Sequence, residues 1–335
     1  MTSVSKTDSA TAQEPPRSSG GTRSRRRGYG AVVLLLATAV AGSLPWWGVD
    51  THVLSVGYTV AFYAAVAQSW NLMSGFTGYI SFAHGALVGI GTYAGILAMN
   101  AGGNLLTAVL AGALAAVAAS VLIGLPSLRL RGIAFAFATI FFQAAMLLVV
   151  QKAGPITGGS EGLAARAIVS LEDLFVTMVA IAGIASVLVY ALRRARLGLR
   201  LLTIREDETA ARTIDVKTVQ LKLGAFATSA LFAGAAGAVH GFFLATVFPQ
   251  NVFHLRTSLE PLVLALIGGA ASTVGPLVMA AVYGISQDAL QSLGSELHLA
   301  MLGVILVVAV LFARNGLADL ATRLWRRLRE RGNRD

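Results

Sequence analysis

Apolar stretches long enough to cross a lipid bilayer recur along this chain and constrain its fold more than any other feature. After a first run from Ala31 to Val49, they lie at about 52–73, 80–99, 105–125, 133–151, 173–192, 223–247, 259–293 and 297–313. Runs of roughly 18 or more apolar residues predict spanning helices, and these runs lack the alternation of a membrane barrel. We therefore expect an all-α polytopic membrane helical bundle of about 9–10 spans.

The composition supports this class. Only 13% of the residues are charged, whereas a soluble domain carries about 25%. Three regions follow from the pattern: residues 1–28 as a disordered basic N-terminal tail, residues 29–315 as a transmembrane domain, and residues 316–335 as a basic C-terminal tail. Within the transmembrane domain, residues 193–222 form the one long charged loop.

The first apolar run has two interpretations. Ala39 and Ala41 resemble the small residues of a signal-peptide cleavage site, so the run is one candidate for a cleaved leader. However, the run continues past this point to Trp46 and Trp47. An anchored span commonly ends in such interfacial aromatic residues, and this favours a membrane helix.

Clustered basic residues set the expected orientation. Arginine-rich loops stay in the cytoplasm, and the clusters here are Arg23, Arg25, Arg26 and Arg27; Arg129 and Arg131; Arg193, Arg194, Arg196 and Arg200; and the tail from Arg323 to Arg334. We expect all four clusters, and with them both termini, on the cytoplasmic side of a bacterial cytoplasmic membrane. Such clusters orient a membrane protein more often than they bind nucleic acid, so we expect no nucleic-acid partner.

The number of crossings then constrains residues 259–293. If this stretch crossed once, the basic C-terminal tail would lie outside. We therefore expect a broken helix pair that crosses twice or re-enters and returns. The breaks are expected at Gly268, Gly269, Gly275 and Pro276, and broken helices are tolerated where they pack within protein or line a cavity.

The chain lacks the motifs of an enzyme. It has no cysteine, so a thiolate metal site is excluded. It has no G-x-x-x-x-G-K-[ST] motif, because none of its four lysines (Lys6, Lys152, Lys217 and Lys222) follows a glycine. No H-E-x-x-H pattern occurs. The letters of G-x-S-x-G occur only at residues 158–162, in a short loop between two apolar runs and not in the strand–turn–helix setting of a catalytic serine. We predict no catalytic residue, no metal site and no cofactor bound by this chain.

A dense block of charge, "LRLLTIREDETAARTIDVKTVQLK", interrupts the apolar pattern at 199–222. Thr203 and Glu206 fit a capping box that starts a helix. Asp207 and Glu208 follow in its first turn, where the helix dipole favours negative charge, and Arg212 is four residues after Glu208. The block therefore predicts a short capped helix near 203–214. It is either a solvated loop that orients the chain or a docking helix for a soluble partner.

Five segments in order resemble one family. They are "GLRLLTIREDETAARTIDV" in the charged block, "NLMSGFTGYISFAHGALVGIGTY" from Asn71, "RLRGIAFAFATI" from Arg129, "TGGSEGL" from Thr157, and "LEPLVLALIGGAASTVGPLVMA" from Leu259. They are similar to segments of ABC importer permeases, specifically the branched-chain amino acid permease family of the LivM type. The chain departs from the family pattern at two places, and both bear on how well it would fit its partners. Asp215 stands where the family usually has glycine, and "LFARNGL" lacks the family's proline.

The resemblance implies partners and a role for the charged block. Such permeases lie in a lipid bilayer and pair with a second homologous permease, two cytoplasmic ATP-binding subunits that use ATP and Mg, and an extracytoplasmic solute-binding protein. The charged block would be the coupling loop that docks on an ATP-binding subunit. The residues expected to couple are Thr203, Arg205, Glu206, Asp207, Glu208, Ala210, Ala211 and Arg212.

Polar residues and glycines within the spans are candidates for the translocation pathway: Asn71, Ser81, His84, Glu260, Gly268 and Gly269. A carboxylate at membrane depth is costly unless it is paired or faces a cavity. Glu260 is therefore either a gating residue or an interfacial cap paired with Arg256. His84 either lines the path or makes a helix contact, and Asn71 fits an interhelical hydrogen bond.

The leading hypothesis is the permease subunit of an ABC importer for branched-chain or related small amino acids. Import of urea or short amides on the same scaffold is the close alternative. A stand-alone secondary transporter would need intramembrane carboxylates, for which Glu260 and Asp288 are the candidates. A passive channel would have no use for a docking helix.

Overall fold

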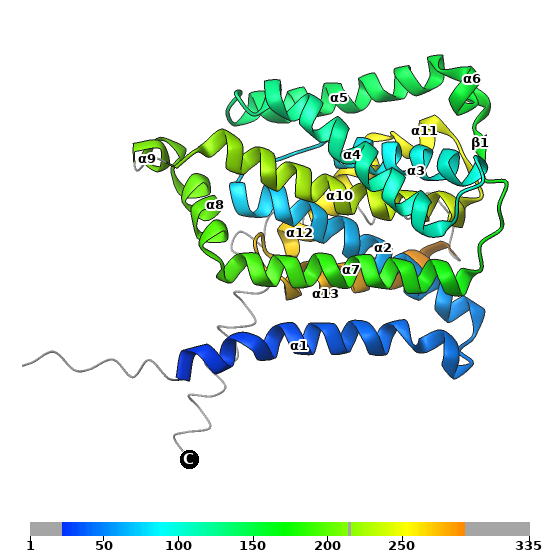
Figure 1. The fold of residues 1–335 in the computed structure, drawn as a ribbon, viewed down its shortest axis with the longest axis horizontal. Coiled ribbons are helices and arrows are strands. Elements are labelled where there is room, and N and C mark those ends of the chain that lie inside the picture. Colours follow the sequence, from blue (N-terminus) through cyan, green and yellow to red (C-terminus); the bar gives the residue numbers. More distant parts are fainter. Residues whose placement is uncertain (1–21, 214–215, 292–335) are drawn as a thin grey trace, which may run out of the picture.

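A computed structural model describes residues 22–213 and 216–291, and these are predominantly helical (Figure 1). The longer helices are α1 (Thr22–Gly42), α2 (Thr51–Trp70), α3 (His84–Asn100), α4 (Leu105–Ser127), α5 (Ile133–Lys152), α7 (Leu171–Arg194), α8 (Arg196–Glu206), α10 (Thr218–Leu244), α12 (Leu255–Gly268) and α13 (Val274–Gln291). The shorter elements are η1 (Leu44–Trp47), the π-helix η2 (Asn71–Gly75), α6 (Gly154–Thr157), η3 (Gly159–Glu161), α9 (Glu208–Thr213) and α11 (Pro249–Val252). Two short strands, β1 (Leu163–Ala164) and β2 (Thr246–Val247), pair antiparallel.

The predicted helical membrane bundle is confirmed. Within the described residues, four helices are long and apolar enough to cross a membrane: α4, α5, α7 and α10. α3 and α12 are shorter, with 17 and 14 residues. The expected total of about 9–10 spans includes the run 297–313, which lies outside the described residues, as do residues 1–21, Asp215 and the C-terminal tail.

α1 differs from the prediction at both ends. It begins at Thr22, so residues 22–28 are helical and not disordered; arginine has a good helix propensity and extends the apolar helix backwards. It ends at Gly42, and the rest of the predicted span forms a turn that contains η1. Pro45 explains this end, because proline cannot continue a helix but is accommodated at the first positions of a new one.

Side-chain caps and charged residues stabilise the ends of α4 and α7. At α4, the side chain of Asn104 accepts a hydrogen bond from the Thr107 amide (2.9 Å), and the Thr107 hydroxyl accepts one from the Asn104 amide (2.8 Å). This reciprocal pair satisfies two amides that a helix leaves without partners. At α7, Ser170 accepts from the Asp173 amide, and Arg193 and Arg194 occupy the last turn, where the helix dipole favours cations.

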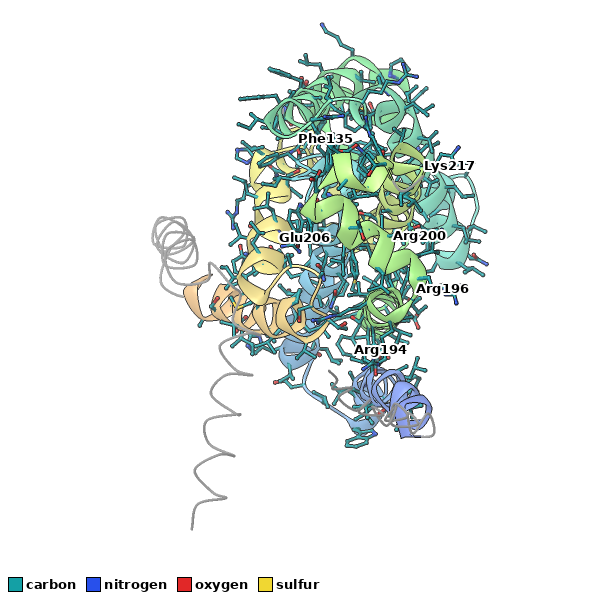
Figure 2. The ribbon with its side chains drawn as sticks, turned by 90° about the vertical axis from the view of Figure 1, so that its left-hand side faces the viewer. Phe135, Arg194, Arg196, Arg200, Glu206 and Lys217 are labelled. Carbon is teal, nitrogen blue, oxygen red and sulfur yellow. The ribbon has the colours of Figure 1, made fainter. Side chains whose placement is uncertain are left out.

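The predicted basic loops gather at one end of the bundle. In Figure 1 the start of α1, the junction between α4 and α5, and the pair α8–α9 all lie at the left. β1, α6 and α11 lie at the right. Figure 2 looks onto the left end, where Arg194 ends α7 and Arg196 and Arg200 lie in α8, and Glu206 and Lys217 lie on the same face. We call this the charged end and the other the opposite end.

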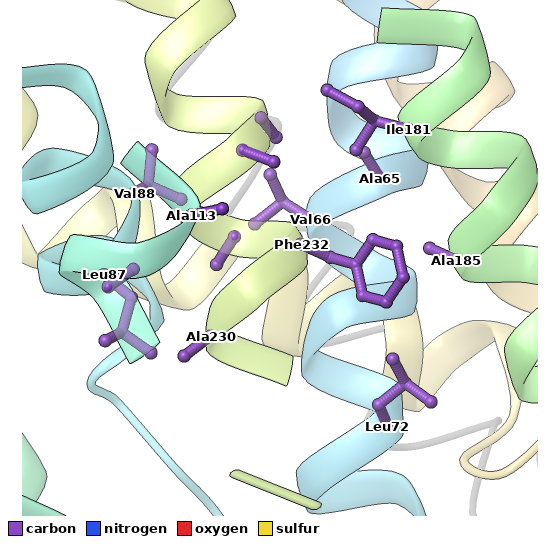
Figure 3. Packing of buried hydrophobic residues seen from close by; sticks show 14 of the residues in the cluster. Ala65, Val66, Leu72, Leu87, Val88, Ala113, Ile181, Ala185, Ala230 and Phe232 are labelled. Atoms are coloured by element: carbon purple, nitrogen blue, oxygen red, sulfur yellow. The ribbon is translucent and has the colours of Figure 1, made fainter. Parts of the chain in front are cut away.

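α3, α4 and α10 form the tightest contact in the bundle. A Cβ atom added to Gly91 of α3 or to Gly112 of α4 would overlap the backbone of Gly234 on α10. Only glycine allows backbones to approach this closely, as is common between membrane helices. Around this contact the core is apolar, and Figure 3 shows Phe232 of α10 beside Ala185 of α7. Small residues at these positions therefore allow the three helices to pack closely.

Two interruptions divide the apolar stretches. The first follows η2: two more helical residues end at Thr77, residues 78–83 are irregular and include Gly78 (φ +75°), and α3 begins only at His84 instead of near residue 80. We call residues 76–83 the turn before α3. The second separates α12 from α13 over residues 269–273, within the predicted range 259–293. There Gly269 has φ +102° and Ala271 has φ +61°. Gly275 and Pro276 were also expected to break the helix but lie in the first turn of α13, where proline is accommodated. Figure 1 shows α13 running alongside α2 toward the opposite end.

Candidate functional site

The charged block folds as two helices, not as one capped helix. α8 continues through the predicted start, and the hydroxyl of Thr203 donates to the carbonyl of Leu199 within that helix (3.0 Å). The predicted capping box of Thr203 and Glu206 is therefore wrong. α8 ends at Glu206, and a second short helix, α9, begins at Glu208.

Asp207 is the residue that separates the two helices. Its backbone is extended (φ −154°, ψ 106°), which ends α8. Its carboxylate accepts hydrogen bonds from the amides of Thr209 (2.7 Å) and Ala210 (3.1 Å). Aspartate is among the strongest N-cap residues, so it starts the helix four residues later than the threonine that the motif indicated. Asp207 is thus the N-cap of α9 and not a residue of its first turn.

Glu208 anchors α9 to the bundle. Its carboxylate accepts hydrogen bonds from Lys222 of α10 (2.9 Å) and from Arg212 of α9 (2.7 Å), so the predicted pair with Arg212 is confirmed. The hydroxyl of Tyr79, in the turn before α3, also donates to it. Lys222 is fully buried and donates in addition to the carbonyl of Leu128 at the end of α4 (3.2 Å). One carboxylate therefore connects α9 with α10, the end of α4 and the turn 76–83.

The charges of this network stabilise each other. Burial opposes ionisation of Glu208, but the hydrogen bonds from Tyr79, Lys222 and Arg212 outweigh it and lower the pKa of Glu208 to about 2. Burial, together with the hydrogen bond to Glu208 and its negative charge, raises the pKa of Tyr79 above its ordinary value. At neutral pH the carboxylate is therefore ionised and the phenol keeps its proton.

Arg205 makes a second connection to the same turn. Its guanidinium donates to the carbonyl of Gly75 at the end of η2 (2.8 Å). Its side chain packs against Gly78, where a Cβ atom would meet Arg205 Cγ at 2.9 Å. Since Gly78 also has a left-handed backbone, this position needs glycine for two reasons.

The predicted coupling residues divide between the bundle and solvent. Ala211 is buried, Thr203 and Glu208 are half-buried, and the remaining members are exposed: Arg205, Glu206, Asp207, Ala210 and Arg212. α9 therefore has one face held by the bundle and one face open. An element of this kind can transmit a displacement from a bound partner to α10 and to the turn 76–83.

Asn71, predicted in the translocation pathway, holds the second interruption in place. It is fully buried, its amide group donates to the carbonyl of Ser272 (2.6 Å), and its side-chain oxygen accepts from the amide of Ala271 (2.7 Å). Gln68 donates to the carbonyl of Thr273 (2.6 Å). Since buried backbone groups outside regular structure need partners, these side chains replace the missing helix bonds between α12 and α13.

His84 and Ser81 lie in the interior near the first interruption. Both are fully buried, and His84 Nε2 lies 2.6 Å from the hydroxyl of Ser229 on α10. The carbonyl of Ser81 accepts from the indole nitrogen of Trp70 (2.9 Å). Both therefore make helix contacts; His84 is not exposed to solvent in this conformation.

Glu260 is paired, as the interfacial interpretation expected. Arg256 donates to its carboxylate over 2.6 Å, and Tyr283 of α13 and Tyr63 of α2 donate over 2.8 and 3.3 Å. The group connects the start of α12 with α13 and α2. Its place between the two helices of the broken pair also keeps a gating role open for Glu260.

The two predicted glycines serve the interruption by different means. Gly268 approaches the backbone of Gly275 so closely that a Cβ atom on either would overlap the other. Gly269 adopts φ +102°, a conformation that L-residues rarely reach. Close backbone contacts at these glycines and side-chain hydrogen bonds from Asn71 and Gln68 together build the break. Among the described residues no cluster of three or more His, Asp or Glu is present.

Lys222 and Tyr79 are the residues of this site that the sequence analysis missed. Lys222 was only noted as a late member of the charged block, although a lysine at the edge of an apolar run signals a buried partner. Tyr79 lies 129 residues before Glu208. No local pattern connects the two.

Comparison with known proteins places these features in a family. The family model described as "Branched-chain amino acid transport system / permease component" matches residues 52–310. The chain belongs to this permease family. A similar protein is the high-affinity branched-chain amino acid transport system permease protein LivM of Escherichia coli (strain K12), 25% identical over 322 residues that cover 86% of this chain and 74% of the relative. LivM of Salmonella typhimurium is 24% identical over 290 residues, covering 77% and 68%.

Membership of the branched-chain amino acid permease family identifies the class of protein to which the charged end belongs. The predicted resemblance is confirmed, and the chain is a membrane permease component of a transport system. Its relatives are transport components and not enzymes. The matched range includes both interruptions, α9 and Lys222.

Proposed function

We propose that this permease is the transmembrane subunit of an ABC importer that moves branched-chain or related small amino acids across the bacterial cytoplasmic membrane. ATP and Mg would be used by two cytoplasmic ATP-binding subunits, a second homologous permease would complete the pathway, and an extracytoplasmic binding protein would deliver the solute. The names of the relatives support the solute class. The chain's own contribution is the pathway and the docking element.

The anchoring of α9 is the observation that carries the coupling role. A helix that merely orients a chain needs no buried contact, because charge alone sets orientation. Here Glu208 reaches a fully buried lysine at the base of α10, while Glu206, Asp207 and Ala210 stay exposed. The exposed side offers a surface for an ATP-binding subunit, and the buried side would pass its movement to the bundle.

The distribution of basic residues supports the orientation. The charged end carries the arginines of the α4–α5 junction and of α7–α8. By the positive-inside rule this end faces the cytoplasm, where the ATP-binding subunits would be. α9 then points into the cytoplasm, and the N-terminus of α1 starts from the same side.

The stand-alone secondary transporter is less well supported. Such a transporter would need a carboxylate to carry a proton or sodium ion. Glu260 is held by Arg256 and two tyrosines, and Asp288 lies 3.3 Å from His52 in a half-exposed pair. The alternative of an importer for urea or short amides differs from this proposal only in the solute, because such an importer would use the same coupling element.

The double change Glu206→Ala/Asp207→Ala tests the proposal. It removes the cap and the charge of the exposed face, so ATP-driven uptake should be abolished while membrane insertion stays intact. Asp207→Asn is the matched control, because asparagine caps a helix as well as aspartate does, and it should retain uptake. Unchanged uptake by the double variant, in cells that depend on this transporter, would refute the coupling role.

A further inference from the structure

A cavity of about 370 Å³ opens at the charged end beside the anchor of α9. Its walls come from the turn before α3, the start of α5 and the end of α8. It combines two kinds of lining that rarely occur together. The cations Arg131 and Arg205 contribute to it, and so do the apolar side chains Ile80 and Ile133.

The charge of this cavity is positive. Arg131 and Arg205 are exposed, and within the described residues neither has a carboxylate within 4.0 Å. Gly75 takes one hydrogen bond from Arg205, which leaves further donors on that guanidinium. Glu208 also lines the cavity, but its charge is compensated by Lys222 and Arg212. The cavity therefore presents two guanidinium groups to an anion.

The apolar side of the cavity continues along the membrane helix. Ile133, Phe137 and Phe141 follow at four-residue spacing on α5 and are all strongly exposed, by 75%, 54% and 68%. The rings of Phe137 and Phe141 stack at 6.4 Å. α5 is also the least buried of the four candidate spans. A continuous apolar stripe therefore starts at the cationic cavity and runs into the membrane.

We propose that this cavity binds the headgroup of an anionic phospholipid of the cytoplasmic leaflet, with its acyl chains along the α5 stripe. A phosphate with an attached glycerol suits two guanidinium groups, which favour bidentate contacts to phosphate. Basic pockets at the cytoplasmic ends of membrane helices select such lipids. The apolar stripe argues for a lipid over free phosphate or a soluble protein. Because Glu208 of α9 and Tyr79 of the turn that holds it both line the cavity, bound lipid would stiffen the docking element.

Native mass spectrometry of the full transporter complex tests the site with phosphatidylglycerol and phosphatidylcholine of identical acyl chains. The wild type should retain phosphatidylglycerol in preference to phosphatidylcholine. Arg131→Gln should lower this retention about fivefold, whereas Arg131→Lys, which keeps the charge and reports on folding, should retain most of it. Arg129→Gln is the matched control, since Arg129 is exposed two residues away and does not line the cavity.

Three results would overturn the proposal. The first is equal retention by Arg131→Gln and the wild type. The second is an equal loss in the Arg129 and Arg131 variants, which would mean diffuse surface charge. The third is displacement of the lipid by inorganic phosphate. In a separate experiment, a photoreactive probe attached to Ile133→Cys, a cavity residue whose replacement keeps both arginines, should cross-link to phosphatidylglycerol, and a cross-link to an ATP-binding subunit in its place would also contradict the proposal. The chain's lack of native cysteine makes the labelling specific.

Discussion

Lys222, buried at the base of α10, donates to the carboxylate of Glu208 on α9 over 2.9 Å. This contact joins a short helix at the charged end to the helix that packs most closely against α3 and α4. Tyr79 adds the turn before α3 to the same carboxylate. The contact thus connects the surface that would meet a partner with the centre of the bundle.

Removing the carboxylate should cost more stability than removing the lysine. Glu208→Gln leaves a fully buried ammonium without its counter-charge, and breaking a buried pair in this way costs about 3–5 kcal/mol. Lys222→Met leaves Glu208 with Arg212 and Tyr79 and with some solvent access. Thermal midpoints of the purified permease in detergent should fall more for Glu208→Gln.

A double-mutant cycle checks that these two effects share one contact. Glu208→Gln/Lys222→Met should be less destabilised than the sum of the single changes, because residues in contact are not additive. Glu172→Gln, an acidic residue at the start of α7, should show additivity with Lys222→Met. Additive effects for the 208/222 pair would contradict the contact.

The contribution of Glu208 should depend on pH. Its pKa is lowered from 4.5 to about 2 in the folded protein, so the folded state binds its proton less readily than the unfolded state. The stabilisation is full above pH 4.5 and is lost as the pH falls toward about 2. The stability difference between the wild type and Glu208→Gln should therefore be smaller at pH 3 than at pH 7. A difference that does not change with pH would refute this assignment.

The approach of α3, α4 and α10 should not tolerate even a methyl group at its centre. Gly234→Ala places a Cβ against the backbone of Gly112, and the overlap should cost about 1–3 kcal/mol, seen as a lower thermal midpoint. Gly224→Ala in the same helix meets no atom within 4 Å. It should be neutral or stabilising, since alanine is the better helix former. Equal effects of the two changes would contradict the packing.

Asn71 should act on the second interruption. Asn71→Ala removes the partners of Ser272 and Ala271, so the amide of Ala271 should exchange its hydrogen faster, and stability should fall by about 1–3 kcal/mol. Thr59→Val is the control, because the Thr59 hydroxyl bonds only within α2 among the described residues. If the control speeds exchange at Ala271 as much as Asn71→Ala, Asn71 does not hold the break.

The sequence predicted the features that depend on local composition. Apolar length indicated the helices, and the glycines at 268 and 269 located the break in the long apolar run. The arginine clusters indicated which loops share one end, and Figure 1 shows them together. These signals are local, so a single sequence carries them.

Two kinds of feature were not predicted: those that depend on which of two possible helix caps is stronger, and those that depend on contacts between residues far apart in the sequence. Thr203 fits a capping motif, but Asp207, four residues later, caps more strongly and divides the block into α8 and α9. Asn71 and Ala271 lie 200 residues apart in the sequence, so nothing near either one reveals their bond. Lys222 was noted only as the last residue of the charged block, because its burial depends on where Glu208 lies in space.

Coupled transport in proteoliposomes tests the central claim most directly. The permease would be reconstituted with its second permease, ATP-binding subunits and solute-binding protein, and both ATP hydrolysis and leucine uptake would be measured for the wild type and Glu208→Gln. If Glu208 fastens α9 to α10, the variant should still assemble with the ATP-binding subunits and hydrolyse ATP, while the number of solute molecules taken up per ATP hydrolysed falls at least about tenfold. The same uptake per ATP in both proteins would contradict the account.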